Sequence, residues 1–122
     1  MSTKIQMVRE MEAAAFAGKW DVFKNYFTDD VYYRVGNTAE VRGPQAVVDY
    51  LRKLLSSQLA INDLQTRAAF EMDDTVILEL NMKGLRMVDK ANVSYPCVDV
   101  YRFKNGKIHD WRVYSIEPTY VV

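Results

Sequence analysis

The chain has 122 residues, a length at which one domain can bury a core of its own. Its 16 basic and 16 acidic residues cancel, which removes the attraction that draws basic proteins to nucleic acids and anionic membranes. We therefore expect no nucleic-acid partner and no membrane partner. A single Cys excludes an internal disulfide, and with a single His it argues against a structural zinc site, so we expect no metal.

The N-terminal segment does not have the pattern of a signal peptide. Charged residues interrupt it where an apolar core would be needed, namely Lys4, Arg9 and Glu10. No apolar run is long enough to span a bilayer, and there is no repeat, linker or low-complexity stretch. We expect one domain over residues 1–122, located in the cytoplasm.

Helices are predicted in the first third of the chain. The first has apolar residues at the spacing of one helix face and stops at Gly18, since glycine readily adopts the left-handed conformation of many helix ends. A second, short helix presents three aromatic residues on one face. The apolar residues of the first helix are Ile5, Val8, Met11 and Ala15, and the aromatic residues of the second are Trp20, Phe23 and Phe27.

A strand and a third helix follow. Asp29 and Asp30 end the second helix, and the β-branched and aromatic run 31–35 predicts a strand. Gly43 and Pro44 predict the start of the third helix, because proline is favoured in a first helical turn. Its expected apolar stripe is Val47, Val48, Leu51, Leu54 and Leu55.

From about Ile61 onward the apolar period changes to two, which is typical of strands. Alternation over 64–70 and a turn at Asp73-Asp74 precede two long strands, 75–87 and 93–103, joined through 89–92. A turn at 104–106 leads into the last strand, 107–116. The order ααβαββββ predicts an α+β domain, with three helices packed on one face of a curved, mostly antiparallel sheet.

Both faces of this sheet carry apolar residues. In strand 75–87, one face is wholly apolar (Val76, Leu78, Leu80, Met82), and Ile77 adds apolar area to the other. Helices cover only one face, so we expect a homodimer in which a second subunit covers the outer face. The alternative is a monomer whose long Lys and Arg side chains shield that face.

Three motifs carry a resemblance to a known superfamily: FTDDV at 27–31, the Gly43-Pro44 helix start, and GKIHDWR at 106–112. With the element order, they resemble the nuclear-transport-factor-2-like superfamily, and above all its SnoaL-like branch, which is similar to ketosteroid isomerases and limonene epoxide hydrolases. The resemblance covers nearly the whole chain. It implies a cone-shaped domain whose concave sheet face and helices enclose an apolar pocket. Because this fold hosts enzymes, binding domains and dimerisation modules, it does not imply one function.

The resemblance also implies which residues line the pocket. Within each strand these residues share parity and therefore one face, which supports the grouping. They are Met11 on the first helix and Tyr33, Val35, Glu79, Asn81, Cys97, Asp99, Tyr101, Trp111 and Val113 on the strands.

The last hairpin has two possible registers. A two-residue loop, Asn105-Gly106, would set Asp99 opposite Arg112 as a cross-strand ion pair. A three-residue loop with Gly106 left-handed would set Asp99 opposite Trp111, facing the pocket. We favour the three-residue loop, because it keeps the aromatic Trp111 inside.

The site patterns of the hydrolase and cyclase relatives are not intact here. The Asp-Arg-Asp trio of limonene epoxide hydrolases is matched by Asn81, Glu79 and Val113. Many polyketide cyclases of the branch place an acid beside the final Trp, where this chain has Arg112 and Val113.

The ketosteroid isomerase pattern survives at one position. The base of these isomerases is matched by Val35, and the tyrosine that holds the oxyanion by Met11. Only the acid that also holds the oxyanion has a counterpart, Asp99.

A few polar residues of the implied pocket remain as candidates for chemistry. Desolvation would raise the pKa of Asp99, which suits a general acid or base. Glu79 could share that role, and Tyr33 could donate a hydrogen bond to a carbonyl or enolate oxygen. Asn81 would orient the substrate. The remaining lining residues would form apolar walls: Met11, Val35, Cys97, Tyr101, Trp111 and Val113.

We expect two residues with reactive side chains, His109 and Cys97, to have no catalytic role. His109 lies near the last turn, where we expect it to be exposed and non-catalytic. Cys97 is expected to be a small buried apolar residue, because no basic partner is evident beside it.

Two functions stay open. The first is an enzyme without metal or cofactor that transfers protons on a hydrophobic carbonyl or polycyclic substrate, as an isomerase, cyclase or dehydratase. The second is a non-catalytic ligand-binding or dimerisation domain. A pocket-lining Asp99 without an ion-pair partner would favour the enzyme, and an Asp99–Arg112 pair on the outer face would favour the second function. We favour the enzyme.

Overall fold

The computed structural model of the protein describes residues 3–115, which form three helices and six strands. The helices are α1 (Lys4–Phe16), α2 (Trp20–Lys24) and α3 (Pro44–Ser57). The strands are β1 (Phe27–Val35), β2 (Val41–Arg42), β3 (Leu59–Met72), β4 (Thr75–Arg86), β5 (Ala91–Lys104) and β6 (Lys107–Ser115). Within the described residues, no helix has the length and apolar character needed to cross a membrane.

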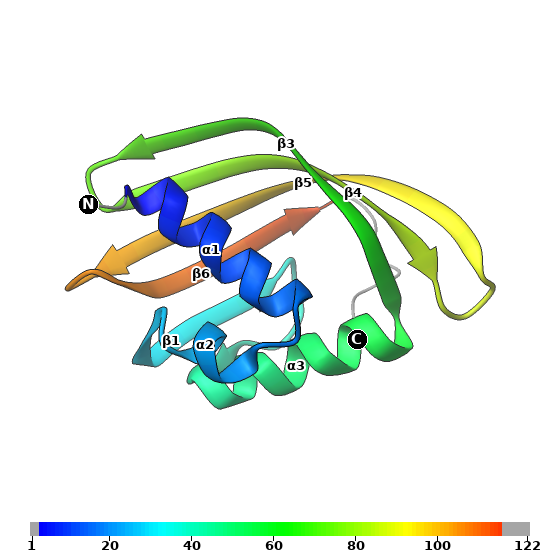
Figure 1. Cartoon of the computed structure of the whole chain (residues 1–122), viewed down its shortest axis with the longest axis horizontal. Helices are drawn as coiled ribbons and strands as arrows, with labels where there is room; N and C mark the ends of the chain where they lie inside the picture. Colours follow the sequence, from blue (N-terminus) through cyan, green and yellow to red (C-terminus); the bar gives the residue numbers. More distant parts are fainter. Residues whose placement is uncertain (1–2, 116–122) are drawn as a thin grey trace.

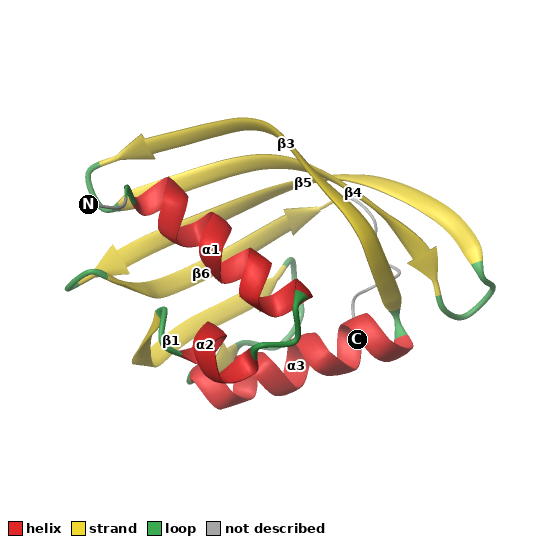
Figure 2. Cartoon of the chain, in the orientation of Figure 1, coloured by secondary structure: helices red, strands yellow, loops and turns green. Residues whose placement is uncertain are grey.

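All six strands belong to one sheet in the order β2-β1-β6-β5-β4-β3. Neighbouring strands are antiparallel except β1 and β6, which run parallel. The sheet is strongly curved, and the three helices lie on its concave side (Figure 1; Figure 2). The predicted α+β class, with three helices on the concave face of a mostly antiparallel sheet, is confirmed.

Local hydrogen bonds define both ends of α1. The Thr3 hydroxyl oxygen accepts a hydrogen bond from the backbone N–H of Gln6 at 3.1 Å, which caps the N-terminus. Gly18 has a φ of +72°, and the backbone N–H of Lys19 donates to the carbonyl of Ala14 at 2.9 Å. The predicted stop at Gly18 is therefore confirmed, and its reason is the left-handed conformation that glycine adopts at low cost.

The boundary between α2 and β1 differs from the prediction. The helix ends at Lys24, where the backbone N–H groups of Asn25 and Tyr26 make short-range turn hydrogen bonds. Phe27 consequently begins β1 instead of lying on the helix, although its ring still packs 4.9 Å from that of Phe23. The two aspartates expected to end the helix, Asp29 and Asp30, lie inside β1, where its pairing with β6 is interrupted.

The strand β2 was not predicted, because two residues carry no readable period. It pairs with β1 through Tyr32 and Tyr33 and leads directly into α3. The predicted start of α3 at Pro44 is confirmed. Four residues of its predicted stripe are buried, namely Val47, Val48, Leu51 and Leu54, and Leu55 is half-buried.

The strands β3, β4 and β5 are long and bend over the helices (Figure 1). The pairing of β3 with β4 is interrupted twice, between Ile61 and Asp63 and between Thr66 and Ala68. Such bulges bend and twist a strand, which lets this sheet curve. The observed ends of β4 and β5 and the start of β6 lie within two residues of the predicted ones. By contrast, β1 begins at Phe27, four residues before the predicted start, and β3 begins at Leu59, five residues before the predicted alternation. Ile116, the predicted end of the last strand, lies outside the described residues.

The turn of the last hairpin has two residues, so the favoured three-residue loop is wrong. Lys104 pairs with Lys107, and Asn105 and Gly106 between them have φ values of +53° and +79°. Two consecutive left-handed residues are typical of the tight turn that Asn-Gly favours.

A β-bulge after this turn decides which residues face inward. The register of β5 with β6 shifts by one residue, which leaves His109 extra. As a result Asp99 pairs with Val113, and neither predicted partner, Arg112 or Trp111, lies opposite it. The bulge turns Trp111 and Val113 to the face that carries Asp99, and all three are buried.

The close approach of β3 to β4 at Gly84 gives a prediction about the sheet. A Cβ added to Gly84 would lie 2.5 Å from the carbonyl oxygen of Ala60 in β3, a backbone atom that cannot move aside alone. We expect Gly84→Ala to lower the free energy of unfolding by about 1–3 kcal/mol, as overpacked sites do. Urea denaturation measures the change, with Lys83→Ala on the exposed face as the control. An unchanged midpoint for Gly84→Ala would contradict the close approach of β3 and β4.

Candidate functional site

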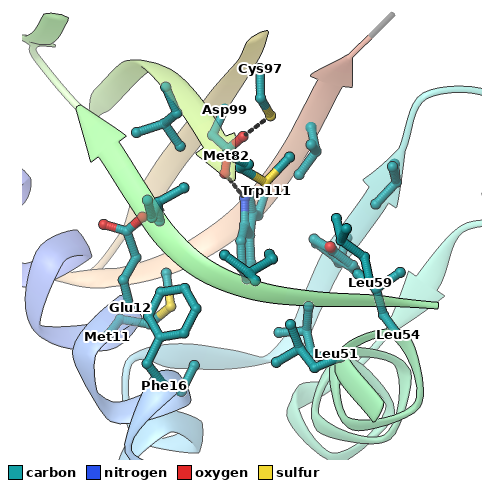
Figure 3. A pocket seen from close by; sticks show the side chains of 18 residues that line it. Met11, Glu12, Phe16, Leu51, Leu54, Leu59, Met82, Cys97, Asp99 and Trp111 are labelled. Atoms are coloured by element: carbon teal, nitrogen blue, oxygen red, sulfur yellow. Dashed lines mark hydrogen bonds between the residues drawn. The ribbon is translucent and has the colours of Figure 1, made fainter. Parts of the chain in front are cut away.

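An apolar pocket lies between the helices and the concave face of the sheet (Figure 3). It leaves about 90 Å³ for the centres of water-sized molecules. One water molecule needs roughly 10–15 Å³ on this measure, so the pocket suits a small organic molecule. The side chains that line it are Met11, Glu12, Ala15, Phe16, Tyr33, Val35, Leu51, Leu54, Leu55, Leu59, Ile61, Leu64, Leu80, Met82, Cys97, Asp99, Trp111 and Val113.

Asp99 is the polar centre of this pocket, and three side chains hold its carboxyl group. Its Oδ1 accepts a hydrogen bond from the Cys97 Sγ at 3.0 Å. Its Oδ2 accepts one from the Tyr101 hydroxyl at 3.1 Å and one from the Trp111 Nε1 at 3.2 Å. A carboxylate offers about four acceptor sites, so one site, on Oδ1, stays open for another donor.

The pKa of the Asp99 carboxyl is raised because burial penalises its charged form, although the hydrogen bonds from Cys97, Trp111 and Tyr101 oppose this effect. Among residues 3–115, no basic side chain forms an ion pair with Asp99. Arg112, the alternative partner from the sequence, binds Asp110 instead, with its Nε 3.0 Å from the Asp110 Oδ1. Asp99 is therefore a buried acid stabilised by neutral donors.

Aromatic rings form the wall next to Asp99. The Trp111 ring lies 4.6 Å from the ring of Tyr33 and 5.1 Å from that of Tyr101, measured between ring centres. Tyr33 lines the pocket as predicted. Tyr101, which was also predicted to line the pocket, does not: it is fully buried behind the lining and contacts Asp99 through its hydroxyl. The rings restrict the movement of Trp111 and thereby fix the donor that it offers to Asp99.

The structure brings most of the predicted lining residues together. Those that line the pocket are Met11, Tyr33, Val35, Cys97, Asp99, Trp111 and Val113. They come from α1, β1, β5 and β6, so residues far apart in the sequence meet at one site. In Figure 3, α1 contributes from one side and α3 from the other, with Trp111 and Asp99 between them.

Glu79 and Asn81 do not face the pocket, so their predicted placement is wrong. Leu80, between them, lines the pocket and pairs with Cys97, which turns both neighbours to the outer face. Glu79 is exposed, and the side-chain amide of Asn81 donates to the hydroxyl of Ser94 at 3.0 Å.

Glu12, which was not predicted as a site residue, also lines the pocket from α1. Burial, followed by the charge of Asp99, raises its pKa to about 8, while Arg9 lowers it. A signal was present in the sequence, because Glu12 lies four residues after Val8 and three before Ala15, on the buried side of the helix. The apolar lining from α3 and β3 was also missed as a pocket feature.

Neither His109 nor Cys97 has the surroundings of a nucleophile or a base at this site. His109 is half-buried, away from the pocket lining, with its Nδ1 3.2 Å from the hydroxyl oxygen of Thr28 and 3.5 Å from the Asp30 Oδ1. Burial raises the pKa of the Cys97 thiol, so this side chain is a neutral donor to Asp99. Within residues 3–115, no group of three His, Cys, Asp or Glu side chains is arranged to hold a metal ion.

The sequence matches the model of one known protein family. The model of the SnoaL-like domain matches residues 8–111, so the chain belongs to that family. None of the curated proteins matches the sequence.

Solved structures agree on the fold. A nuclear-transport-factor-2-like protein of unknown function from Burkholderia pseudomallei has a TM-score of 0.83 and 18% identity, over 94% of this chain and 92% of that one. A putative isomerase from Bacillus subtilis has a TM-score of 0.79 and 16% identity, over 96% and 88%. An LEH-like epoxide hydrolase from M. tuberculosis has a TM-score of 0.74 and 18% identity, over 91% and 80%. At these identities the likeness shows the fold and leaves the chemistry to the site.

The Trp111 donor gives a prediction about Asp99. In Trp111→Phe the ring stays, but the Nε1 that donates to Asp99 is lost. We expect the pKa of Asp99 to rise further and the free energy of unfolding to fall by about 1–3 kcal/mol. Carbon-13 NMR of the labelled carboxyl measures the pKa. The control is Trp20→Phe, whose ring packs on Phe23 at 5.3 Å far from any bond to Asp99. An unchanged Asp99 titration would contradict this hydrogen bond.

Proposed function

We propose that this protein is an acid/base enzyme that transfers a proton on a small hydrophobic substrate with a carbonyl group. One observation carries the proposal: the Asp99 carboxyl lines an apolar pocket with a raised pKa and, among residues 3–115, without an ion-pair partner. A raised pKa makes a carboxyl a better base when ionised and an available donor when protonated. The expected reaction type is isomerisation, aldol-type cyclisation or dehydration.

The chemistry follows from the geometry around Asp99. The substrate ring would lie against Trp111 and Tyr33, with its reacting carbon near the open acceptor site on the Asp99 Oδ1. The three existing hydrogen bonds hold the carboxyl in place, so no reorganisation is needed when it takes a proton. The largely apolar lining screens charges weakly, so the charge that moves during the proton transfer interacts more strongly with the carboxyl than it would in water.

Further expectations belong to the same proposal. The lining is almost wholly apolar, which favours a small hydrophobic ligand. Proton transfer between carboxyl groups and a carbonyl compound requires no cofactor or metal. We also propose a cytoplasmic location, because the lone Cys97 is a free thiol.

A second candidate function is ligand binding without turnover. It is favoured by the three donors on Asp99, which satisfy most of its acceptor sites in the way that a structural buried carboxyl requires. In that case the open acceptor site on Oδ1 would bind a donor group of the ligand.

The two candidates predict different behaviour for Asp99→Asn. If Asp99 transfers the proton, the variant should lose about 10²–10⁴-fold in rate while it still binds the ligand. The measurement is deuterium uptake from D₂O at the α-carbon of a panel of cyclic ketones, followed by proton NMR. Asp110→Asn, a change at the outer-face partner of Arg112, is the control. Equal rates for the wild type and Asp99→Asn would leave the binding function and reject the enzyme.

We also propose that the protein is a homodimer whose subunits meet through the outer face of the sheet. Ile77, Val98 and Tyr114 expose apolar surface there, on β4, β5 and β6, and Val98 pairs directly with Tyr114. Charges of both signs surround them, among them Glu79 and Arg102, so a second copy rotated by a two-fold axis can match opposite charges. The net charge of zero adds no repulsion between two copies.

The dimer is tested by a charge placed in this apolar surface. Val98→Lys should dissociate the dimer, because the new charged side chain of each subunit would be buried against the other subunit. Sedimentation equilibrium should give twice 14.1 kDa for the wild type and 14.1 kDa for the variant. Val88→Lys, at an exposed position in the β4–β5 turn, is the matched control. A monomeric wild type at micromolar concentration would reject the dimer.

A further inference from the structure

Two cavities meet beside Glu12. The apolar pocket and a more open groove between α1 and β3 share four lining residues, Glu12, Phe16, Ile61 and Leu64. The groove is polar, since its other lining residues are Arg9, Asn62, Asp63 and Thr66. Glu12 therefore lies at the junction, in contact with the pocket that contains Asp99 and with the groove that opens to solvent.

The two carboxyl groups of the pocket have different surroundings. Asp99 accepts three hydrogen bonds that stabilise its anionic form. Among residues 3–115, the Glu12 carboxyl has no hydrogen-bond partner, and the pocket lining contains no basic side chain. When two carboxyls share an apolar site, the one with the better-stabilised anion ionises first and the other retains the proton.

We propose that Glu12 is the second catalytic carboxyl of this pocket: it donates a proton to the substrate oxygen while the Asp99 carboxylate acts as the base. The inference rests on the proposed function, to which it adds the proton donor. It also fixes how a carbonyl substrate would bind, with its oxygen toward α1 and its α-carbon toward β5.

The step balances with these two groups alone. The Asp99 Oδ1 takes the proton from the α-carbon, and the C–H electron pair forms the C=C bond of an enol. The π pair of the carbonyl takes the proton of Glu12, which becomes a carboxylate. In the second half, Asp99 returns its proton to carbon at the α- or γ-position, and the enol O–H returns its proton to Glu12. Solvent in the groove can also restore that proton.

The charges around Glu12 are consistent with a neutral acid. Burial and the charge of Asp99 raise its pKa to about 8, and Arg9 on the same helix lowers it. From the facing strands, Asp63 lines the groove on β3, and the Cys97 thiol lines the pocket on β5. Because the folded-state pKa is above the ordinary 4.5, the folded protein holds this proton between about pH 4.5 and 8.

The first test measures the protonation of Glu12 without any substrate. The stabilising contribution of a neutral Glu12 is complete below pH 4.5 and is lost as the pH rises to about 8. The free energy of unfolding of the wild type minus that of Glu12→Gln should therefore fall across this window. Glu10→Gln, an exposed acid on the same helix, should show no such trend. A flat difference for Glu12→Gln overturns the inference.

The second test separates this inference from the proposed function through deuterium uptake by the same cyclic ketones. We expect Glu12→Gln to lose about 10²-fold or more in rate, and the high-pH limb of the wild-type pH profile to disappear. If Asp99→Asn loses activity but Glu12→Gln retains the wild-type rate and profile, the proposed function stands and the role of Glu12 is rejected. If the wild type does not exceed Asp99→Asn, the proposed function itself fails.

Discussion

The placement of one carboxyl group in an apolar interior is the constraint on which this structure depends. A buried carboxyl costs several kcal/mol unless hydrogen bonds or a proton compensate for lost water. Cys97 and Tyr101 provide two of those bonds from β5, since they lie two residues on either side of Asp99 on the same face. The third comes from Trp111, which only the bulge at His109 turns inward. The register of the last hairpin therefore determines both the aromatic wall of the pocket and the hydrogen bonds of its acid.

The sequence predicts most of the fold because helix and strand periods are local signals. The alternation in 76–82 identifies the buried face of β4 from the residues alone, and the structure agrees with it. The placement of Glu79 and Asn81 inside came instead from a resemblance, and it contradicts that alternation. A one-residue error in alignment reverses the face of a whole strand, so the local apolar pattern is the better guide to orientation.

Other features of the site depend on contacts that no local pattern contains. The sequence locates the last turn at Asn105-Gly106 but not its two-residue form, and the extra residue at His109 lies where Trp111 packs against distant rings. The pocket itself requires α1, α3 and the curved strands together. Glu12 was readable as a charged residue on an apolar helix face, yet its importance appears only once Asp99 lies across the same cavity.

The fold that this family shares does not determine the chemistry. The surroundings of the individual side chains in the pocket do. In an apolar cavity, charges are weakly screened, so small differences in hydrogen bonding change proton affinity strongly. Asp99 accepts hydrogen bonds from three donors, whereas Glu12 has no donor among the described residues. The charge of Asp99 also raises the pKa of Glu12. Pairs of acids whose surroundings separate their proton affinities can divide the roles of base and acid between them. The proposed proton transfer therefore requires only the two carboxyl groups of the pocket, whose lining contains no histidine.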